Sequence, residues 1–132
     1  MPANVSGLVT IQSAHSVPET IARLESIVAS RGLRIFARID FSADALREGL
    51  ALKPMVQLVF GNPKAGTPLL VSAPTIGIDL PLRVLVWEDA GGAVWVAYND
   101  PDTIAQRHGL PPDLARNIAA VRTLAAEAAK AA

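Results

Sequence analysis

Residues 82–98 have the sequence LRVLVWEDAGGAVWVAY, and this stretch decides which fold the sequence predicts. Two runs rich in β-branched and aromatic residues, Leu82–Trp87 and Ala93–Tyr98, flank a loop that contains two glycines. This pattern is typical of an antiparallel β-hairpin. The spacing places Trp87 and Trp95 opposite each other, and we interpret both as packing residues of a core or a dimer rather than as ligand-stacking residues.

Further strands and helices are predicted on either side of this hairpin. Alternating or continuous apolar runs predict strands over Val5–Ser13, Leu33–Asp40 and Met55–Phe60. Caps, helical spacing and terminal glycines predict helices from the Ser16 cap to Gly32, over Phe41–Leu50 with Ser42 as cap, over Thr67–Ser72, from the Asp100 cap to Gly109, and over Leu114–Ala129. Residues 61–64 are expected to form a turn. The order indicates one α+β domain over residues 1–132, with an antiparallel twisted sheet and helices mainly on one face.

Composition restricts the classes of function. The 132 residues are 51% hydrophobic and 18% charged, which indicates a globular chain, and the formal net charge is zero. That balance argues against a nucleic-acid binder, which normally carries a basic excess. With no cysteine, and with His15 and His108 as its two histidines, the chain is expected to hold no metal and no cofactor. No signal peptide or membrane-spanning run is expected, so a cytoplasmic location is predicted.

Lys64 is the sharpest candidate for a ligand-binding residue. It follows Asn62 and Pro63 in the predicted turn beside Gly66, where backbone N–H groups and the lysine ammonium can converge on a small anionic ligand such as a phosphate or carboxylate. The motif is not a phosphate-binding loop, which requires Gly-Lys-Ser/Thr at the start of a helix. A solvated lysine on a tight turn is the commoner arrangement, and the sequence leaves both interpretations open.

Asp79 and Tyr98 are the other candidates. Asp79 lies between Ile78 and Leu80, and this apolar setting suits a carboxyl group that carries a proton. The same side chain can instead accept backbone N–H bonds or pair with Arg83. Tyr98 ends the last predicted strand and can present its hydroxyl to a ligand, although a tyrosine at a strand end more often packs its ring.

Several short motifs together resemble one known family. They are Arg38-Ile39-Asp40, Phe60–Leu69, Ile78–Leu82, Val86–Asp89, Val94–Pro101 and Arg107–Leu110. Their combination extends over nearly the whole chain and resembles the bacterial and archaeal family called domain of unknown function 302. One departure is that Phe41 follows Asp40 where many members have histidine, so any role of that histidine would be missing here.

The resemblance implies a fold and an assembly but no activity. It implies one α+β domain akin to a single repeat of the TATA-box-binding-protein fold, and it implies that two copies pair as a homodimer. A fold name of this kind carries no implication of DNA binding. The function expected first is therefore a homodimeric domain that binds a small ligand or a protein partner.

Each functional hypothesis requires a particular arrangement of residues. Pairing through the sheet face would use four valines of the hairpin, which are Val84, Val86, Val94 and Val96. The alternative is a small metabolic enzyme in which Lys64 holds an anionic group and Asp79 carries a proton, and it requires one pocket that joins these two residues to Tyr98. Nucleic-acid binding would require a positive face made by Arg34, Arg38, Lys53 and Arg83.

Overall fold

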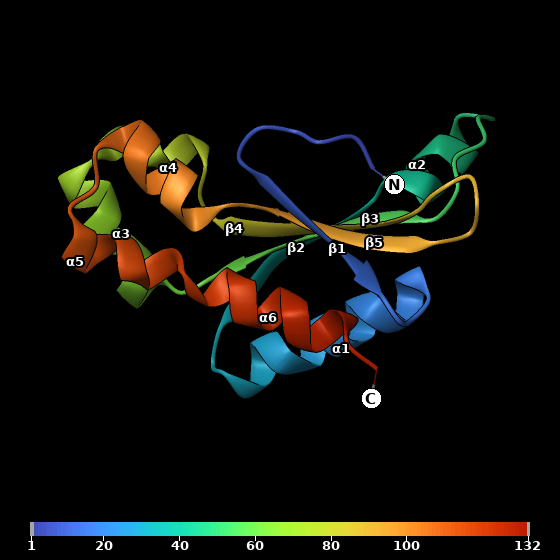
Figure 1. The fold of residues 1–132 in the computed structure, drawn as a ribbon, viewed down its shortest axis with the longest axis horizontal. Helices are drawn as coiled ribbons and strands as arrows, with labels where there is room; N and C mark the ends of the chain where they lie inside the picture. Colours follow the sequence, from blue (N-terminus) through green and yellow to red (C-terminus); the bar gives the residue numbers. More distant parts are fainter. Residues whose placement is uncertain (1, 132) are drawn as a thin grey trace.

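Five strands form a single antiparallel sheet in the computed structural model, which describes residues 2–131 (Figure 1). The strand order is β1-β5-β4-β3-β2. The strands are β1 Leu8–Ser13, β2 Arg34–Asp40, β3 Met55–Gly61, β4 Leu82–Glu88 and β5 Val94–Asn99. The predicted hairpin forms β4 and β5, and Trp87 pairs with Trp95 in its register.

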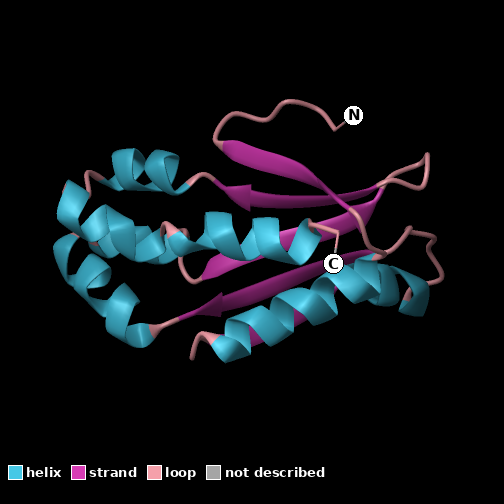
Figure 2. Cartoon of the chain, turned by 60° about the horizontal axis from the view of Figure 1, so that its bottom comes forward, coloured by secondary structure: helices cyan, strands magenta, loops and turns pink. Residues whose placement is uncertain are grey.

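The helices divide into two groups. They are α1 Val17–Ser30, α2 Phe41–Arg47, α3 Pro63–Ser72, α4 Pro101–His108, α5 Pro112–Ala115 and α6 Ala120–Ala129, with two 3-10 helices, η1 Pro74–Ile78 and η2 Arg116–Ile118. Helices α1 and α6 form the first group and lie side by side on one face of the sheet (Figures 1 and 2). The predicted α+β class, with an antiparallel sheet and helices covering one face, is confirmed.

The main core lies between the sheet and helices α1 and α6. Val84, Val86 and Val96 are fully buried there, and Val94 is 7% exposed. These four valines therefore cannot supply a dimer interface, and that expectation from the sequence is wrong. Because side chains alternate along a strand, the face of the hairpin away from α1 and α6 carries the intervening residues, among them Leu85 and Trp87, which are partly exposed.

One helix start and one helix cap differ from the sequence prediction. Helix α3 begins at Pro63, where a turn was expected, because Asn62 Oδ1 accepts a bond of 3.0 Å from the Lys64 N–H and proline suits the first helical position. Helix α2 is capped by Asp40 rather than by Ser42: Asp40 Oδ1 accepts from the Ala43 N–H at 2.9 Å. In both places a side chain at the end of a strand starts the next helix directly.

The predicted C-terminal helix over Leu114–Ala129 is broken into α5, η2 and α6. The break has a physical cause, because the apolar residues of this segment serve two different cores. Ile118, at the end of η2, packs in a second apolar cluster, whereas Val121 in α6 packs in the main core. Among residues 2–131, no helix combines the length and the hydropathy that crossing a bilayer requires.

The second cluster lies beyond one end of the sheet. Here α3, η1, α4, α5 and η2, which we call the helical end, gather where β3 ends and β4 begins (Figure 1). The buried members of the cluster are Leu69, Ile76, Ile104, Ala105, Leu110 and Ile118. Local sequence patterns did not predict the space that is left between this cluster and the strand ends.

Candidate functional site

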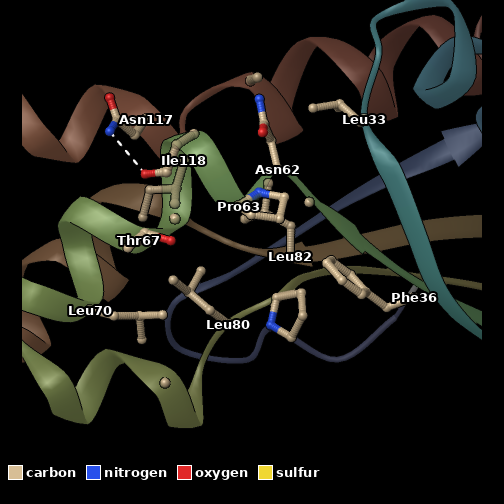
Figure 3. A pocket seen from close by; sticks show the side chains of 16 residues that line it. Leu33, Phe36, Asn62, Pro63, Thr67, Leu70, Leu80, Leu82, Asn117 and Ile118 are labelled. Atoms are coloured by element: carbon tan, nitrogen blue, oxygen red, sulfur yellow. Dashed lines mark hydrogen bonds between the residues drawn. The ribbon is translucent and has the colours of Figure 1, made fainter.

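A cavity of about 330 Å³ lies between the helical end and the sheet (Figure 3). Its lining comes from the starts of β2 and β4, the end of β3, helix α3, the segment around η1, and the chain from η2 into α6. The lining residues are Leu33, Phe36, Gly61, Asn62, Pro63, Ala65, Gly66, Thr67, Leu70, Gly77, Leu80, Pro81, Leu82, Asn117, Ile118 and Ala120. The volume falls within the usual range of small-molecule sites.

Two local features of the backbone shape the cavity wall. The β2–β3 register shifts between Ile35 and Ala37, and Phe36 lies at this irregularity and lines the cavity. At the end of β3, a Cβ on Gly61 would stand 3.6 Å from Phe36 Cε2 and 3.7 Å from Pro81 Cβ. Glycine at this position therefore keeps one corner of the cavity open.

Polar groups are few in the cavity. Asn62, Thr67 and Asn117 are the polar side chains of the lining. Asn62 uses its carbonyl oxygen to cap α3, and Asn117 Nδ2 donates to the carbonyl oxygen of Ala65 at 3.0 Å (Figure 3). No charged side chain belongs to the described lining, so the cavity suits a neutral, mainly apolar molecule.

The structure separates the four residues proposed from the sequence. Asn62 lines the cavity, but Lys64, Asp79 and Tyr98 do not. Lys64 is exposed on the first turn of α3. Tyr98 is 7% exposed and packs in the main core, where burial raises the pKa of its hydroxyl above the ordinary tyrosine value.

Asp79 is held by two residues of α4. Its Oδ2 lies 2.6 Å from His108 Nε2, and Arg107 Nη1 donates to both carboxylate oxygens at 3.0 and 3.1 Å. The Asp79 side chain is 16% exposed, and its observed partners are not the Arg83 that the sequence suggested. The carboxylate thus joins η1 to the end of α4, a contact between the motifs at 78–82 and 107–110.

The arrangement that the enzyme hypothesis required is not found in either of two cavities. A second, more open hollow of about 610 Å³ lies beside α2 and is lined by Ser42, Ala43, Leu46, Leu50, Ala51, Leu52, Lys53 and Pro54. Lys64, Asp79 and Tyr98 line neither this hollow nor the cavity beneath the helical end. Sequence reasoning missed Phe36, whose position depends on a bulge, and Asn117, which lies in the unpredicted break of the last helix.

The positive face required for nucleic-acid binding is also divided. Arg38 lies 3.9 Å from Glu25 and Lys53 lies 3.2 Å from Glu88, so two of the four cations have carboxylate partners. Arg34 stacks its guanidinium over the Phe36 ring, 5.7 Å from the ring centre. These contacts leave no continuous row of free cations among the four positions.

Comparison with protein families gives a match over almost the whole chain. The model of the family described as domain of unknown function DUF302 matches residues 9–130. A crystal structure of an uncharacterized conserved protein DUF302 from Bacillus stearothermophilus has a TM-score of 0.77 and 21% sequence identity, covering 95% of this chain and 97% of that one. This structural likeness supports the fold and, at that identity, the fold alone.

Curated relatives match at higher identity but over part of their length. The chain is 50% identical over 112 residues to a protein of Brucella suis biovar 1 (strain 1330) named fluoride-specific ion channel FluC 1, covering 83% of this chain and 44% of that protein. Proteins of Brucella abortus and Brucella melitensis, named FluC 1 and FluC 2, match with the same identity and with 42% of their length covered. The chain thus spans less than half the length of these relatives.

Proposed function

This chain belongs to the family described as domain of unknown function DUF302, and we propose that it is a binding domain for a small, neutral, mainly apolar ligand. The cavity of about 330 Å³ beneath the helical end carries the proposal. Its size and apolar lining are those of small-molecule sites, in which a few polar groups fix the orientation of the ligand. The polar side chains of the lining that would take this role are Asn62, Thr67 and Asn117.

A neutral ligand is favoured over the small anion that the sequence suggested. Transferring an anion from water into an apolar site costs free energy unless a cation or several donors receive it. Lys64, the cation expected to do so, is exposed outside the cavity. The same observation weakens the alternative of an enzyme that combines Lys64 with Asp79.

Filling the cavity tests the proposal. A Cβ on Gly66 would meet no heavy atom within 4 Å, and Gly66 does not have a positive φ, so Gly66→Leu places a side chain in the cavity without forcing the backbone. The neutral fluorophore prodan serves as the probe. We expect the wild type to bind prodan and Gly66→Leu to bind it at least about tenfold more weakly, since the leucine occupies the same volume.

Ser72→Leu is the matched control, because Ser72 is an exposed residue of the same helix and does not line the cavity. This variant should bind prodan as the wild type does. Equal affinity in all three proteins would contradict the proposed site. Native mass spectrometry of protein purified from its own host would then identify the natural ligand and report the assembly state.

Pairing of two copies through the sheet face away from α1 and α6 belongs to the same proposal. On that face Leu85 lies opposite Ala97 and Trp87 lies opposite Trp95; Leu85 and Trp87 are partly exposed, whereas Ala97 and Trp95 are buried. A two-fold axis would place the same patch of both copies in contact. In sedimentation equilibrium, the wild type should be a dimer and Leu85→Glu a monomer; a wild-type monomer at micromolar concentration would contradict the pairing.

A second candidate function follows from the curated relatives. A segment 50% identical to this chain forms part of proteins named fluoride-specific ion channels, and more than half of each relative lies outside the match. We propose that the domain can act as an accessory domain of such a channel, with ligand binding in the cavity as its input. The lack of cysteine suits the reducing cytoplasm, which we propose as the location.

An exchange experiment tests this accessory role. Fluoride tolerance is measured in cells that make Brucella suis FluC 1, the same protein without its matching segment, and a chimera with this chain in that place. Deletion should change tolerance and the chimera should restore it. Unchanged tolerance after deletion would remove this candidate while leaving the ligand-binding proposal standing.

A further inference from the structure

Three polar side chains of η1 and α4 meet outside the cavity. Thr75 Oγ1 lies 2.8 Å from His108 Nδ1, and His108 Nε2 lies 2.6 Å from Asp79 Oδ2. None of the three residues lines the cavity beneath the helical end. The cluster is therefore separate from the proposed ligand site and is not explained by it.

The bonding partners determine which ring nitrogen carries the proton. A carboxylate only accepts hydrogen bonds, so His108 Nε2 donates its N–H to Asp79. In the neutral imidazole Nδ1 then has a lone pair, and the Thr75 hydroxyl donates to it. The Thr75 hydroxyl proton thus points at the His108 base, and the Asp79 carboxylate fixes the imidazole ring from the other side.

The three side chains of the cluster differ in burial. A nucleophile must be exposed, and the base that activates it can be buried. The His108 side chain is 5% exposed and Asp79 is 16% exposed, whereas Thr75 is open to solvent. Arg107 Nη1 donates to both oxygens of Asp79 and fixes the carboxylate. The imidazole is mostly buried, while the hydroxyl remains accessible to a reagent.

An apolar side chain lies on the same side of η1 as the hydroxyl. Residues three apart eclipse one another in a 3-10 helix, so Ile78 lies on the same side of η1 as Thr75. Ile78 is 71% exposed, so this side of η1 presents an apolar side chain as well as the hydroxyl. This neighbour favours a reagent with an uncharged organic group.

We propose that Thr75 is a nucleophile that accepts an acyl group from an activated carboxylic ester. Thr75 Oγ1 attacks the carbonyl carbon and forms a new C–O bond, and its proton passes to His108 Nδ1. The bond from the carbonyl carbon to the leaving oxygen breaks, and the alcohol leaves with that proton. A hydroxyl bonded to a base that a third group orients is the general arrangement for such chemistry.

The acyl group on Thr75 is the product of this first step, and no oxidant or reductant takes part. Water can then attack the same carbonyl carbon while His108 takes a proton from it. The carboxylic acid leaves, and Thr75 Oγ1 recovers a proton from His108. Asp79 acts through His108 and is a positioning residue.

The test uses p-nitrophenyl acetate as the probe and follows acetylation by intact mass and peptide mapping. We expect one acetyl group on Thr75 in the wild type and none at that position in Thr75→Val. Because a general base contributes about 100-fold or more, His108→Gln should acetylate at least about 100-fold more slowly. Thr75→Ser keeps a hydroxyl at the same place and should be acetylated there.

Ser72→Ala is the control, since Ser72 is another exposed hydroxyl close in sequence and has no histidine partner. This variant should react as the wild type does. Acetylation that is spread over lysines, with Thr75 modified no more than Ser72, would overturn the proposal. If circular dichroism shows that His108→Gln does not fold, Thr75→Val and Thr75→Ser provide the test. A purely structural cluster would give both of these variants the same acetylation pattern as the wild type.

Discussion

His108 Nε2 lies 2.6 Å from Asp79 Oδ2, across the junction of α4 and η1. The two residues are 29 positions apart, in motifs that the sequence analysis treated separately. Their contact turns Asp79 from an isolated candidate into one member of a cluster with His108 and Arg107. It also fastens η1, whose Gly77 lines the cavity, to the helix that follows the last strand.

Removing the Asp79 carboxylate should destabilise the fold. Asp79→Ala leaves the buried N–H of His108 without its acceptor, and an unsatisfied buried polar group costs about 1–3 kcal/mol. Asp79→Asn keeps a carbonyl oxygen that can accept the same bond, so its loss should be smaller. Urea unfolding measures both variants, and equal midpoints for Asp79→Ala and the wild type would show that the contact contributes nothing.

Asp100 and Asp102 offer a matched pair at the start of α4. Arg122 Nη2 lies 2.8 Å from Asp100 Oδ1 and 3.0 Å from Asp102 Oδ2, but Asp100 also caps the helix through the Asp102 N–H. Asp100→Ala should therefore cost about 1–2 kcal/mol. Asp102 is 73% exposed, and Asp102→Ala should cost less than about 0.5 kcal/mol. Thermal unfolding that ranks the two in the opposite order would contradict the capping role.

Asp89 makes the hairpin sensitive to acid. The Trp95 indole N–H, 2.8 Å from Asp89 Oδ2, holds the pKa of this carboxyl below its ordinary value, with further bonds from the Ala93 and Gly91 N–H groups. Because the folded pKa is the lower one, the stabilisation is present above the unfolded pKa of about 3.9 and is lost as pH falls through the folded pKa. The expected direction is thus a loss of stability in acid.

Two measurements check this sign. The stability difference between wild type and Asp89→Asn should shrink as pH is lowered from about 7 to about 2. In a Trp87→Phe background, fluorescence reports on Trp95 alone and should change with a midpoint below the ordinary aspartate value. A midpoint above that value would contradict the assignment.

Two glycines should respond to alanine with opposite signs. Gly32 has a φ of +69°, so Gly32→Ala forces a left-handed conformation and should cost about 1–2 kcal/mol. Gly66 lies inside α3 with open space around its Cβ position, so Gly66→Ala should stabilise the protein by about 0.5–1 kcal/mol. Chemical denaturation distinguishes the two, and destabilisation by Gly66→Ala would mean that the cavity wall cannot accept a methyl group.

Much of the fold follows from short-range patterns in the sequence. The hairpin, with Trp87 opposite Trp95, was predicted from two apolar runs and a loop containing glycines. The start of α1 was predicted because Ser16 accepts from the Glu19 N–H, an interaction that needs only neighbouring residues. Such contacts are local, so the residues that make them are visible together in the sequence.

The face that each strand buries was harder to predict. Both faces of β4 and β5 carry large apolar residues, so alternation alone did not show which set lies beneath α1 and α6. The valines were assigned to an interface and are core residues instead. Only the positions of the two helices settled the choice.

The sequence by itself determined the class of fold, the hairpin and the helices α1 and α4, because those depend on spacing, caps and turns within a few residues. Tertiary structure alone decided the site. The cavity needs the β2 bulge at Phe36, the early start of α3 and the break at Ile118, and the Asp79–His108 contact needs α4 packed on η1. Each depends on how distant segments pack against one another, and no local pattern encodes such packing.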